Sequence, residues 1–191
     1  ARNPGQSRPP LGCVLRQTCW TWVRRPEAET APGSGRSSGV RRVVFFSSIN
    51  AQGSVLTGHP PALLPIDDDY PHHPATPYQL SKHLGEEICR SFSERHGMIT
   101  LCLRPTWVTQ PRDYTEAGFG TESFLATWEP DLWAYVDVRD VGNAVLRCLQ
   151  VEGIVHDCFL LAADDTSAHV PTAELVARHF AGVPWRAVDP E

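Results

Sequence analysis

Two short apolar segments on either side of one well-marked helix constrain the fold of this chain more than any other feature. Residues 43–46 are continuously apolar and residues 99–103 nearly so, which is typical of strands buried on both faces of a parallel sheet. Between them, Thr76 suits the N-cap of a helix, Pro77 suits its first position, and Gln79 completes a capping box. A strand, a helix and a strand in this order form a βαβ unit, so we expect an α/β fold with a Rossmann-type parallel sheet and flanking helices.

The predicted helix has a regular apolar pattern. Leu80, Leu84, Ile88 and Phe92 recur every four residues and form one apolar stripe, as in an amphipathic helix. Gly97 is placed to end the helix, because glycine readily adopts the left-handed conformation of a C-terminal cap.

Three regions of different character divide the chain. Residues 1–40 contain repeated prolines and a Gly/Ser-rich end, and we interpret them as irregular, either as a linker or as a segment foreign to the fold. Residues 41–111 form the C-terminal part of a Rossmann-type domain. Residues 112–191 form a small substrate-binding portion with returning strands and helices.

Within the last region the patterns are shorter. We expect residues 112–131 to be loop-like, residues 133–136 and 158–162 to form strands, and a helix to end the chain at residues 172–180. A further helix carries Val138, Val141, Val145 and Leu149 on one face, with Asp137 as its N-cap.

Composition excludes several classes of function. The net charge of -5 gives no electrostatic reason to expect nucleic acid or an anionic membrane as a partner. No apolar segment approaches the roughly 20 residues that span a bilayer, so we expect a cytoplasmic protein. The six cysteines contain no Cys-x-x-Cys pair, and we expect buried thiols rather than disulfides or zinc ligands.

A polar loop carries possible metal ligands. Asp67, Asp68, Asp69, His72 and His73 stand close together in the sequence. Adjacent residues rarely converge on one ion without other support, so we expect a solvated loop and no metal. His83 and His96 on the predicted helix are interpreted as surface or packing residues.

One pair on the predicted helix suggests chemistry. Tyr78 and Lys82, the only lysine of the chain, lie four residues apart, so their side chains share one face of the helix. A cation beside a phenol favours the phenolate, and such a tyrosine can exchange a proton with an alcohol or a carbonyl. Ser48 follows the first strand, at the edge where α/β sheets place ligands, and its hydroxyl can bind the reacting oxygen. The alternative is an exposed pair worth only about 0.2–0.5 kcal/mol of helix stability.

Four segments carry a wider pattern: residues 43–53, residues 77–82 followed by Glu86, residues 103–108 and residues 135–141. In this order and at this spacing they resemble the extended short-chain dehydrogenase/reductases, which include the NAD-dependent epimerase/dehydratase family. The resemblance implies NAD or NADP as cofactor and a small-molecule substrate with a hydroxyl or carbonyl group, such as a sugar derivative. It also allows a homodimer.

The resemblance implies a role for each matching residue. Tyr78 is then the catalytic acid/base, Lys82 binds the nicotinamide ribose and activates Tyr78, and Ser48 orients the substrate oxygen. Trp107 faces the substrate together with Ser48. The residues implied to contact the cofactor are Ser47, Tyr78, Lys82, Pro105, Thr106 and Val108.

The sequence departs from the family pattern in two places. The family's first strand and its Gly-x-x-Gly-x-x-Gly turn have no counterpart here, so the N-terminal half of the fold is expected to be missing. Trp107 stands where many members have asparagine, which argues against a nucleotide-sugar substrate. Three hypotheses remain: an NAD(P)-dependent oxidoreductase or epimerase, a catalytically silent fragment of one, and a non-enzymatic dinucleotide-binding or interaction domain.

Overall fold

The main sheet contains four strands in the order β1-β2-β3-β6. In the computed structural model, β2 (Arg42–Phe46), β3 (Ile99–Pro105) and β6 (His156–Leu161) run parallel. β1 (Trp20–Val23) adds an antiparallel edge beside β2. The parallel core confirms the expected Rossmann-type α/β fold, with β6 starting two residues earlier than predicted.

The structure describes residues 20–23, 39–53 and 60–186. Of the region 1–40, which we expected to be irregular, Trp20–Val23 instead form β1, so that expectation is wrong for these four residues. Apart from residues 39 and 40, the rest of that region lies outside the described residues.

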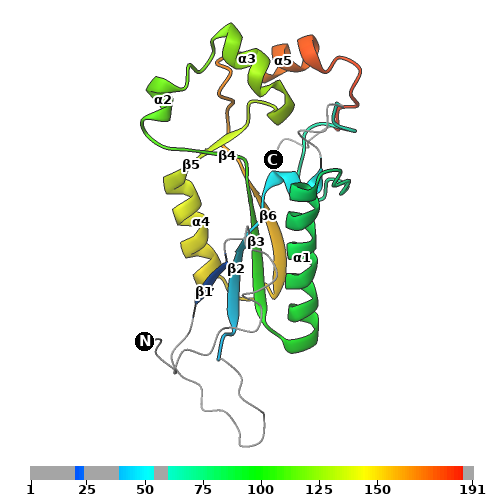
Figure 1. The fold of residues 1–191 in the computed structure, drawn as a ribbon, viewed down its shortest axis with the longest axis vertical. Helices are drawn as coiled ribbons and strands as arrows, with labels where there is room; N and C mark the ends of the chain where they lie inside the picture. Colours follow the sequence, from blue (N-terminus) through cyan, green and yellow to red (C-terminus); the bar gives the residue numbers. More distant parts are fainter. Residues whose placement is uncertain (1–19, 24–38, 54–59, 187–191) are drawn as a thin grey trace, which may run out of the picture.

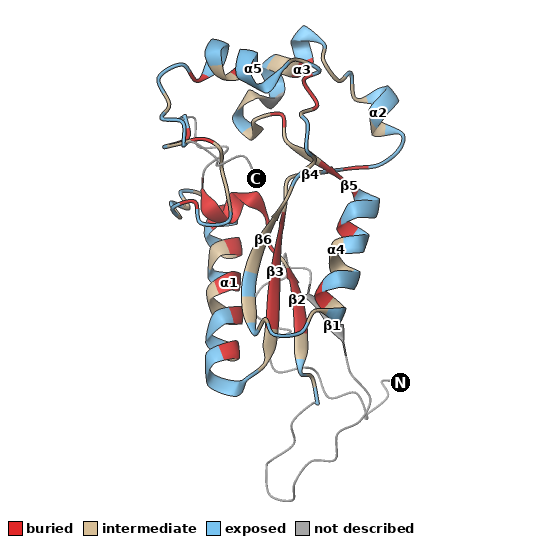
Figure 2. Ribbon diagram, turned by 180° about the vertical axis from the view of Figure 1, so that it is seen from behind, coloured by how far each residue is buried: buried red, intermediate tan, exposed pale blue. Residues whose placement is uncertain are grey.

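Helices cover the two faces of the sheet, α1 (Pro77–His96) on one and α4 (Val138–Gln150) on the other (Figure 1). Because side chains alternate along a strand, each helix meets its own set of residues. Phe45 and Cys102 pack with Cys89 of α1, whereas Val44 and Leu101 pack with Cys148 of α4. The strands β2 and β3 are therefore buried on both faces, as Figure 2 shows.

The ends of α1 agree with the prediction. Thr76 Oγ1 accepts a hydrogen bond from the Gln79 backbone N–H, and Gln79 Oε1 accepts one from the Thr76 N–H, which completes the capping box. Gly97 ends the helix with a left-handed φ of 63°. Asp137 likewise caps α4, as predicted.

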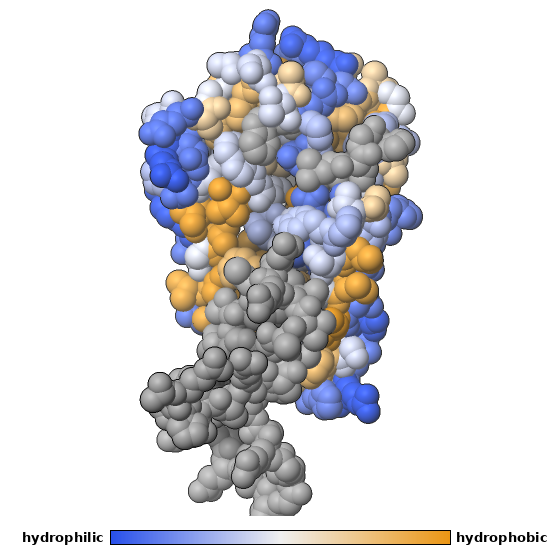
Figure 3. All heavy atoms as spheres, in the orientation of Figure 1, coloured by the Kyte–Doolittle hydropathy of each residue, from blue (hydrophilic) through white to orange (hydrophobic). Residues whose placement is uncertain are grey.

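The buried face of α1 is not the predicted apolar stripe. Leu80 and Leu84 remain 45% and 48% exposed, and Figure 3 shows hydrophobic residues at the surface over this helix. A Cβ on Gly85 would lie 2.4 Å from the Phe45 ring, so the helix approaches the sheet too closely for a larger side chain there. The residues of α1 that are buried are Gln79, Lys82, Gly85, Glu86, Cys89 and Ser93.

Residues 112–131 are not loop-like throughout, which corrects the prediction. They contain α2 (Asp113–Glu116), α3 (Glu122–Trp128) and the 3-10 helix η2 (Glu129–Asp131). The cause is local: Thr121 Oγ1 accepts from the Phe124 N–H and so caps α3. The buried members of the apolar cluster into which α3 packs are Leu64, Phe124, Trp133, Ala168, Leu175 and Phe180.

A second, two-stranded sheet joins the parallel core to residues 112–134 and 163–183, which we call the upper region (Figure 1). β4 (Trp107–Thr109) pairs in parallel with β5 (Tyr135–Asp137), so the strand predicted at 133–136 starts two residues late. Leu132 and Trp133 have φ values of 57° and 52°, which are incompatible with a strand. The last helix, α5, spans Thr172–His179, close to its predicted range.

No helix in the described ranges is long and apolar enough to cross a membrane. The cysteines in those ranges are free thiols, with Cys89, Cys102 and Cys148 buried and Cys158 partly so. Cys13 and Cys19 lie outside the described residues.

Candidate active site

The carboxyl ends of the parallel strands define the edge of the sheet where the predicted site residues gather. β2 ends at Phe46, β3 at Pro105 and β6 at Leu161. Ser47 and Ser48 follow β2 directly. Open α/β sheets bind ligands outside this edge.

The two serines differ in their contacts. Ser48 caps the 3-10 helix η1 (Ile49–Gln52), where its Oγ accepts from the Asn50 N–H at 3.2 Å. Ser47 is 4% exposed, and its Oγ has no hydrogen-bond partner among the described residues. A buried hydroxyl left in this state loses its hydrogen bonds to water without replacement, so it suits a ligand that supplies a polar atom.

Lys82 links α1 to the end of β2. Its side chain is buried, and its Nζ donates to the Phe46 carbonyl oxygen at 2.9 Å. The same Nζ lies 5.7 Å from the centroid of the Tyr78 ring, within the range of a cation–π interaction. Tyr78 and Lys82 thus share one face of α1, as the helical spacing predicted, and Lys82 also contacts Phe46 at the end of β2.

Tyr78 lies in the first turn of α1 and is 45% exposed. A half-exposed phenol beside a buried ammonium can be reached by a small molecule at the sheet edge. Among the described residues, the hydrogen bonds of Ser48 do not include Tyr78.

The residues after β3 that we expected to contact the cofactor or the substrate differ from one another in their surroundings. The Thr106 N–H and Oγ1 both donate to the Leu161 carbonyl oxygen at 3.1 Å, which ties the end of β3 to β6. Val108 is 37% exposed. The Trp107 ring packs 5.5 Å from Phe119 and 6.0 Å from Phe124 between ring centroids, so the indole belongs to the wall of the upper region.

Arg104 forms a buried ion pair that the sequence did not reveal. It is 3% exposed, and its Nε and Nη2 donate to the two carboxylate oxygens of Glu86 at 2.9 and 3.0 Å. Its Nη1 donates to the Asp68 carbonyl oxygen at 2.9 Å. Burial disfavours the charge of Arg104, but the bond to Glu86 outweighs this and raises its pKa. One guanidinium therefore joins β3, α1 and the loop before α1.

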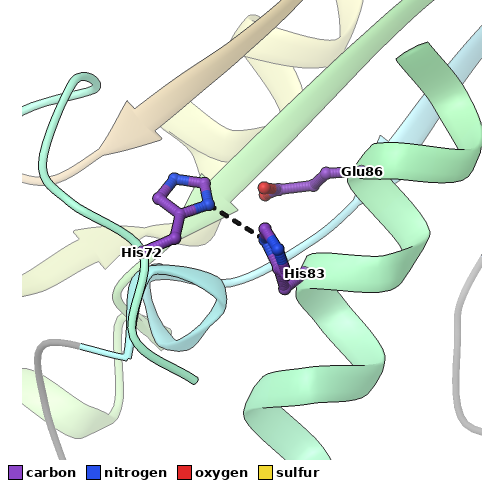
Figure 4. Close-up of side chains that lie close together, drawn as sticks. All are labelled: His72, His83 and Glu86. Atoms are coloured by element: carbon purple, nitrogen blue, oxygen red, sulfur yellow. Dashed lines mark hydrogen bonds between the residues drawn. The ribbon is translucent and has the colours of Figure 1, made fainter. Parts of the chain in front are cut away.

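A histidine pair extends this network (Figure 4). Arg104 Nη2 lies 3.2 Å from His72 Nε2, and a guanidinium only donates, so His72 Nε2 accepts. His72 Nδ1 then carries the proton and donates to His83 Nδ1 at 2.9 Å. Burial, followed by the charge of Arg104, lowers the pKa of His72, in agreement with a neutral ring.

The same cluster has the composition of a metal site. Ligand atoms of His72, His83 and Glu86 lie within 4.8 Å of one another. However, both oxygens of Glu86 already bind Arg104, and coordination through His72 Nδ1 would turn an Nε2–H toward the guanidinium. We interpret the cluster as a hydrogen-bond network that holds the loop of residues 67–73 on α1.

Two sequence signals could have found this network. An arginine inside the apolar β3 segment must be buried and therefore needs an acidic partner. Glu86 follows Lys82 by one helical turn and so lies on the same face of α1. The role of His83 had no such signal, because its partner lies in an irregular loop.

Residues 33–129 match the model of the NAD dependent epimerase/dehydratase family. A protein of Methanocaldococcus jannaschii described as a putative UDP-glucose 4-epimerase is 35% identical over 126 residues. This match covers 60% of the chain and 40% of the relative.

A solved structure shows the same fold. A short-chain dehydrogenase/reductase superfamily protein from Agrobacterium tumefaciens with bound NAD is similar with a TM-score of 0.50 and 24% identity, over 80% of this chain and 56% of that one. The UDP-glucose 4-epimerase of Thermus thermophilus in complex with NAD gives a TM-score of 0.46 and 20% identity, over 78% and 51%. The chain thus spans about half the length of these structures and less of the curated relative.

Proposed function

Because this chain belongs to the NAD-dependent epimerase/dehydratase family, we propose that it carries the nicotinamide half-site and the catalytic residues of an oxidoreductase or epimerase. The substrate would contain a hydroxyl or carbonyl group. The observation that carries the proposal is the buried Lys82 ammonium, which is bonded to the end of β2 and lies beside the Tyr78 ring.

Each catalytic residue has a distinct task in this proposal. Tyr78 donates a proton to the substrate oxygen or accepts one from it. Lys82 keeps a positive charge next to that phenol. Ser48 accepts from Asn50, and no acceptor among the described residues takes its own proton, so its hydroxyl can donate to the substrate oxygen.

The residues at the strand ends fit the nicotinamide half of NAD or NADP. The buried Ser47 Oγ without a partner and the Lys82 ammonium offer polar contacts, and Pro105, Thr106 and Val108 would lie along the ring. The bound cofactor would supply or accept the hydride. An NADH titration tests the proposal, because binding by the folded chain must then depend on Lys82.

The alternative of a catalytically silent fragment predicts a different combination of results. A silent fragment would have the same fold, and it would bind NADH only if the cofactor contacts present in this chain are sufficient for binding. It shows no turnover that depends on Tyr78. A dinucleotide-binding domain without activity predicts binding alone.

The outer face of α1 supports pairing of two copies. Leu80 and Leu84 are about half exposed on one stripe of the helix, and Ile88 and Phe92 continue it with partly buried side chains. Association through this stripe would remove apolar surface from water.

We therefore expect the chain to sediment as a dimer and a Leu84→Glu variant as a monomer, because the charge would have to be buried in the interface. Analytical ultracentrifugation checks this. The exposed Arg90 on the same helix gives a control, since Arg90→Met should leave the dimer intact. A wild-type chain that sediments as a monomer would rule out the pairing.

A further inference from the structure

A pocket of about 180 Å³ lies against the carboxyl ends of the parallel strands. Ile49, which directly follows Ser48, lines it, as do Thr106 after β3 and both Leu160 and Ala162 at the end of β6. The segments that follow β2 and β3 and the end of β6 thus line one pocket at the edge where α/β sheets bind ligands. Ser48, Tyr78 and Lys82 are not part of its lining, so the pocket lies beside the proposed catalytic residues.

The opposite wall comes from the upper region and is apolar. Leu132, Trp133, Leu175, Val176 and Phe180 form much of it. None of the described lining residues is charged, and their only hydroxyl groups belong to threonines.

One of these hydroxyls, that of Thr106, already donates to Leu161. A diphosphate needs arginine, lysine or clustered N–H donors, so this pocket does not suit the phosphates of a nucleotide sugar.

The size of the pocket suits a small occupant. An apolar cavity of about 150 Å³ holds one benzene molecule, so 180 Å³ accommodates a single six-membered ring with a short substituent. Burial of such a ring removes apolar surface from water, which favours binding.

The backbone around the pocket is held in an unusual conformation. Leu132 and Trp133 adopt left-handed φ values of 57° and 52°, which cost energy in residues with a side chain. The Trp133 Nε1–H donates to the Leu125 carbonyl oxygen at 2.9 Å, and Ser167 donates through both N–H and Oγ to the Trp133 carbonyl oxygen. These bonds fix the indole in the wall, as in a preformed binding site.

We propose that this pocket binds an apolar ring of the substrate, of phenyl or cyclohexyl size, next to Ser48. This assignment rests on the proposed function. It narrows the substrate class to aryl or cycloalkyl alcohols and ketones. The relative from Methanocaldococcus jannaschii is described as a putative UDP-glucose 4-epimerase, and the described lining of this pocket offers no charged group to the phosphates of UDP-glucose.

Acetophenone is a suitable probe of the pocket, with UDP as the comparison. The indole N–H resonances of Trp133 and Trp185 report binding, because both residues line the pocket. We expect saturable shifts of these resonances with acetophenone and none with UDP. Ala162→Phe, at an exposed lining position, should weaken acetophenone binding at least tenfold by filling the pocket.

Gly142→Ala on α4 is the control, since its new Cβ meets no atom within 4 Å and acetophenone binding should not change. If Ala162→Phe does not fold, Val176→Phe replaces it. No saturable shift with acetophenone, equal binding by the filled variant, or UDP binding at these indoles would each overturn the assignment. NADH binding distinguishes the two proposals: acetophenone binding without NADH binding refutes the proposed function, and the reverse refutes only the pocket assignment.

Discussion

Arg104→Met is expected to destabilise the protein by about 3–5 kcal/mol, the usual cost of removing one partner from a buried ion pair. The loss follows because Glu86, which is 3% exposed, would keep a charge without its two guanidinium bonds. The Asp68 carbonyl oxygen and His72 Nε2 would also lose a donor. Urea unfolding followed by circular dichroism measures the change.

Two further variants test whether the loss of stability comes from the buried ion pair itself. Arg90 pairs with Glu87 and Glu94 on the surface of α1, so Arg90→Met should leave the unfolding midpoint unchanged. The double variant Arg104→Met/Glu86→Leu should recover much of the loss, because it removes both charges together. An Arg104→Met midpoint equal to that of Arg90→Met would show that the buried pair does not hold the loop, helix and strand together.

Tyr78→Phe is expected to lower turnover by about 10²–10⁴-fold, the usual contribution of a general acid or base. The unfolding midpoint should stay the same, since the ring is half exposed and only its hydroxyl is removed. NADH oxidation with a carbonyl substrate is the assay. Tyr135→Phe is the matched control, because it removes a hydroxyl bonded to Asp165 from a strand of the second sheet.

The outcomes of this assay separate the functional hypotheses. Equal rates for Tyr78→Phe and the unmodified chain would contradict the role of the phenol. A folded chain that binds NADH but has no turnover would support the silent or non-enzymatic alternatives instead.

Local signals account for the parts of the fold that the sequence predicted. The capping box at Thr76, the left-handed Gly97 and the doubly buried strands depend on neighbouring residues, and all are found in the structure. The resemblance of four segments to the NAD-dependent epimerase/dehydratase family is confirmed by the family model, and the parallel sheet confirms the expected Rossmann-type fold.

Contacts between distant residues explain what the sequence could not show. The apolar stripe of α1 gave no sign that the helix buries polar residues, because their partners lie on β2 and β3. Lys82 bonds to Phe46, and Glu86 bonds to Arg104. The helix α3 depends on one cap and one apolar cluster, which the loop-like composition of residues 112–131 concealed.

The candidate site was predictable in position but not in its surroundings. The spacing of Tyr78 and Lys82 placed them on one helix face, and the order of strand and helix placed Ser48 at the same edge of the sheet. The histidine pair and the apolar pocket depend on how the loop before α1 and the upper region fold back onto that edge. The catalytic roles themselves remain predictions.

The most direct test of the central claim is a fluorescence titration of the purified chain with NADH and NADPH, beside Lys82→Ala and the control Arg90→Met. Both variants remove a positive charge from α1, but only Lys82 is bonded at the end of β2. Circular dichroism establishes that each variant is folded. The proposal predicts saturable binding by the unmodified chain and by Arg90→Met, with binding lost in Lys82→Ala; a folded chain that binds neither dinucleotide, or a Lys82→Ala variant that binds equally well, would contradict it.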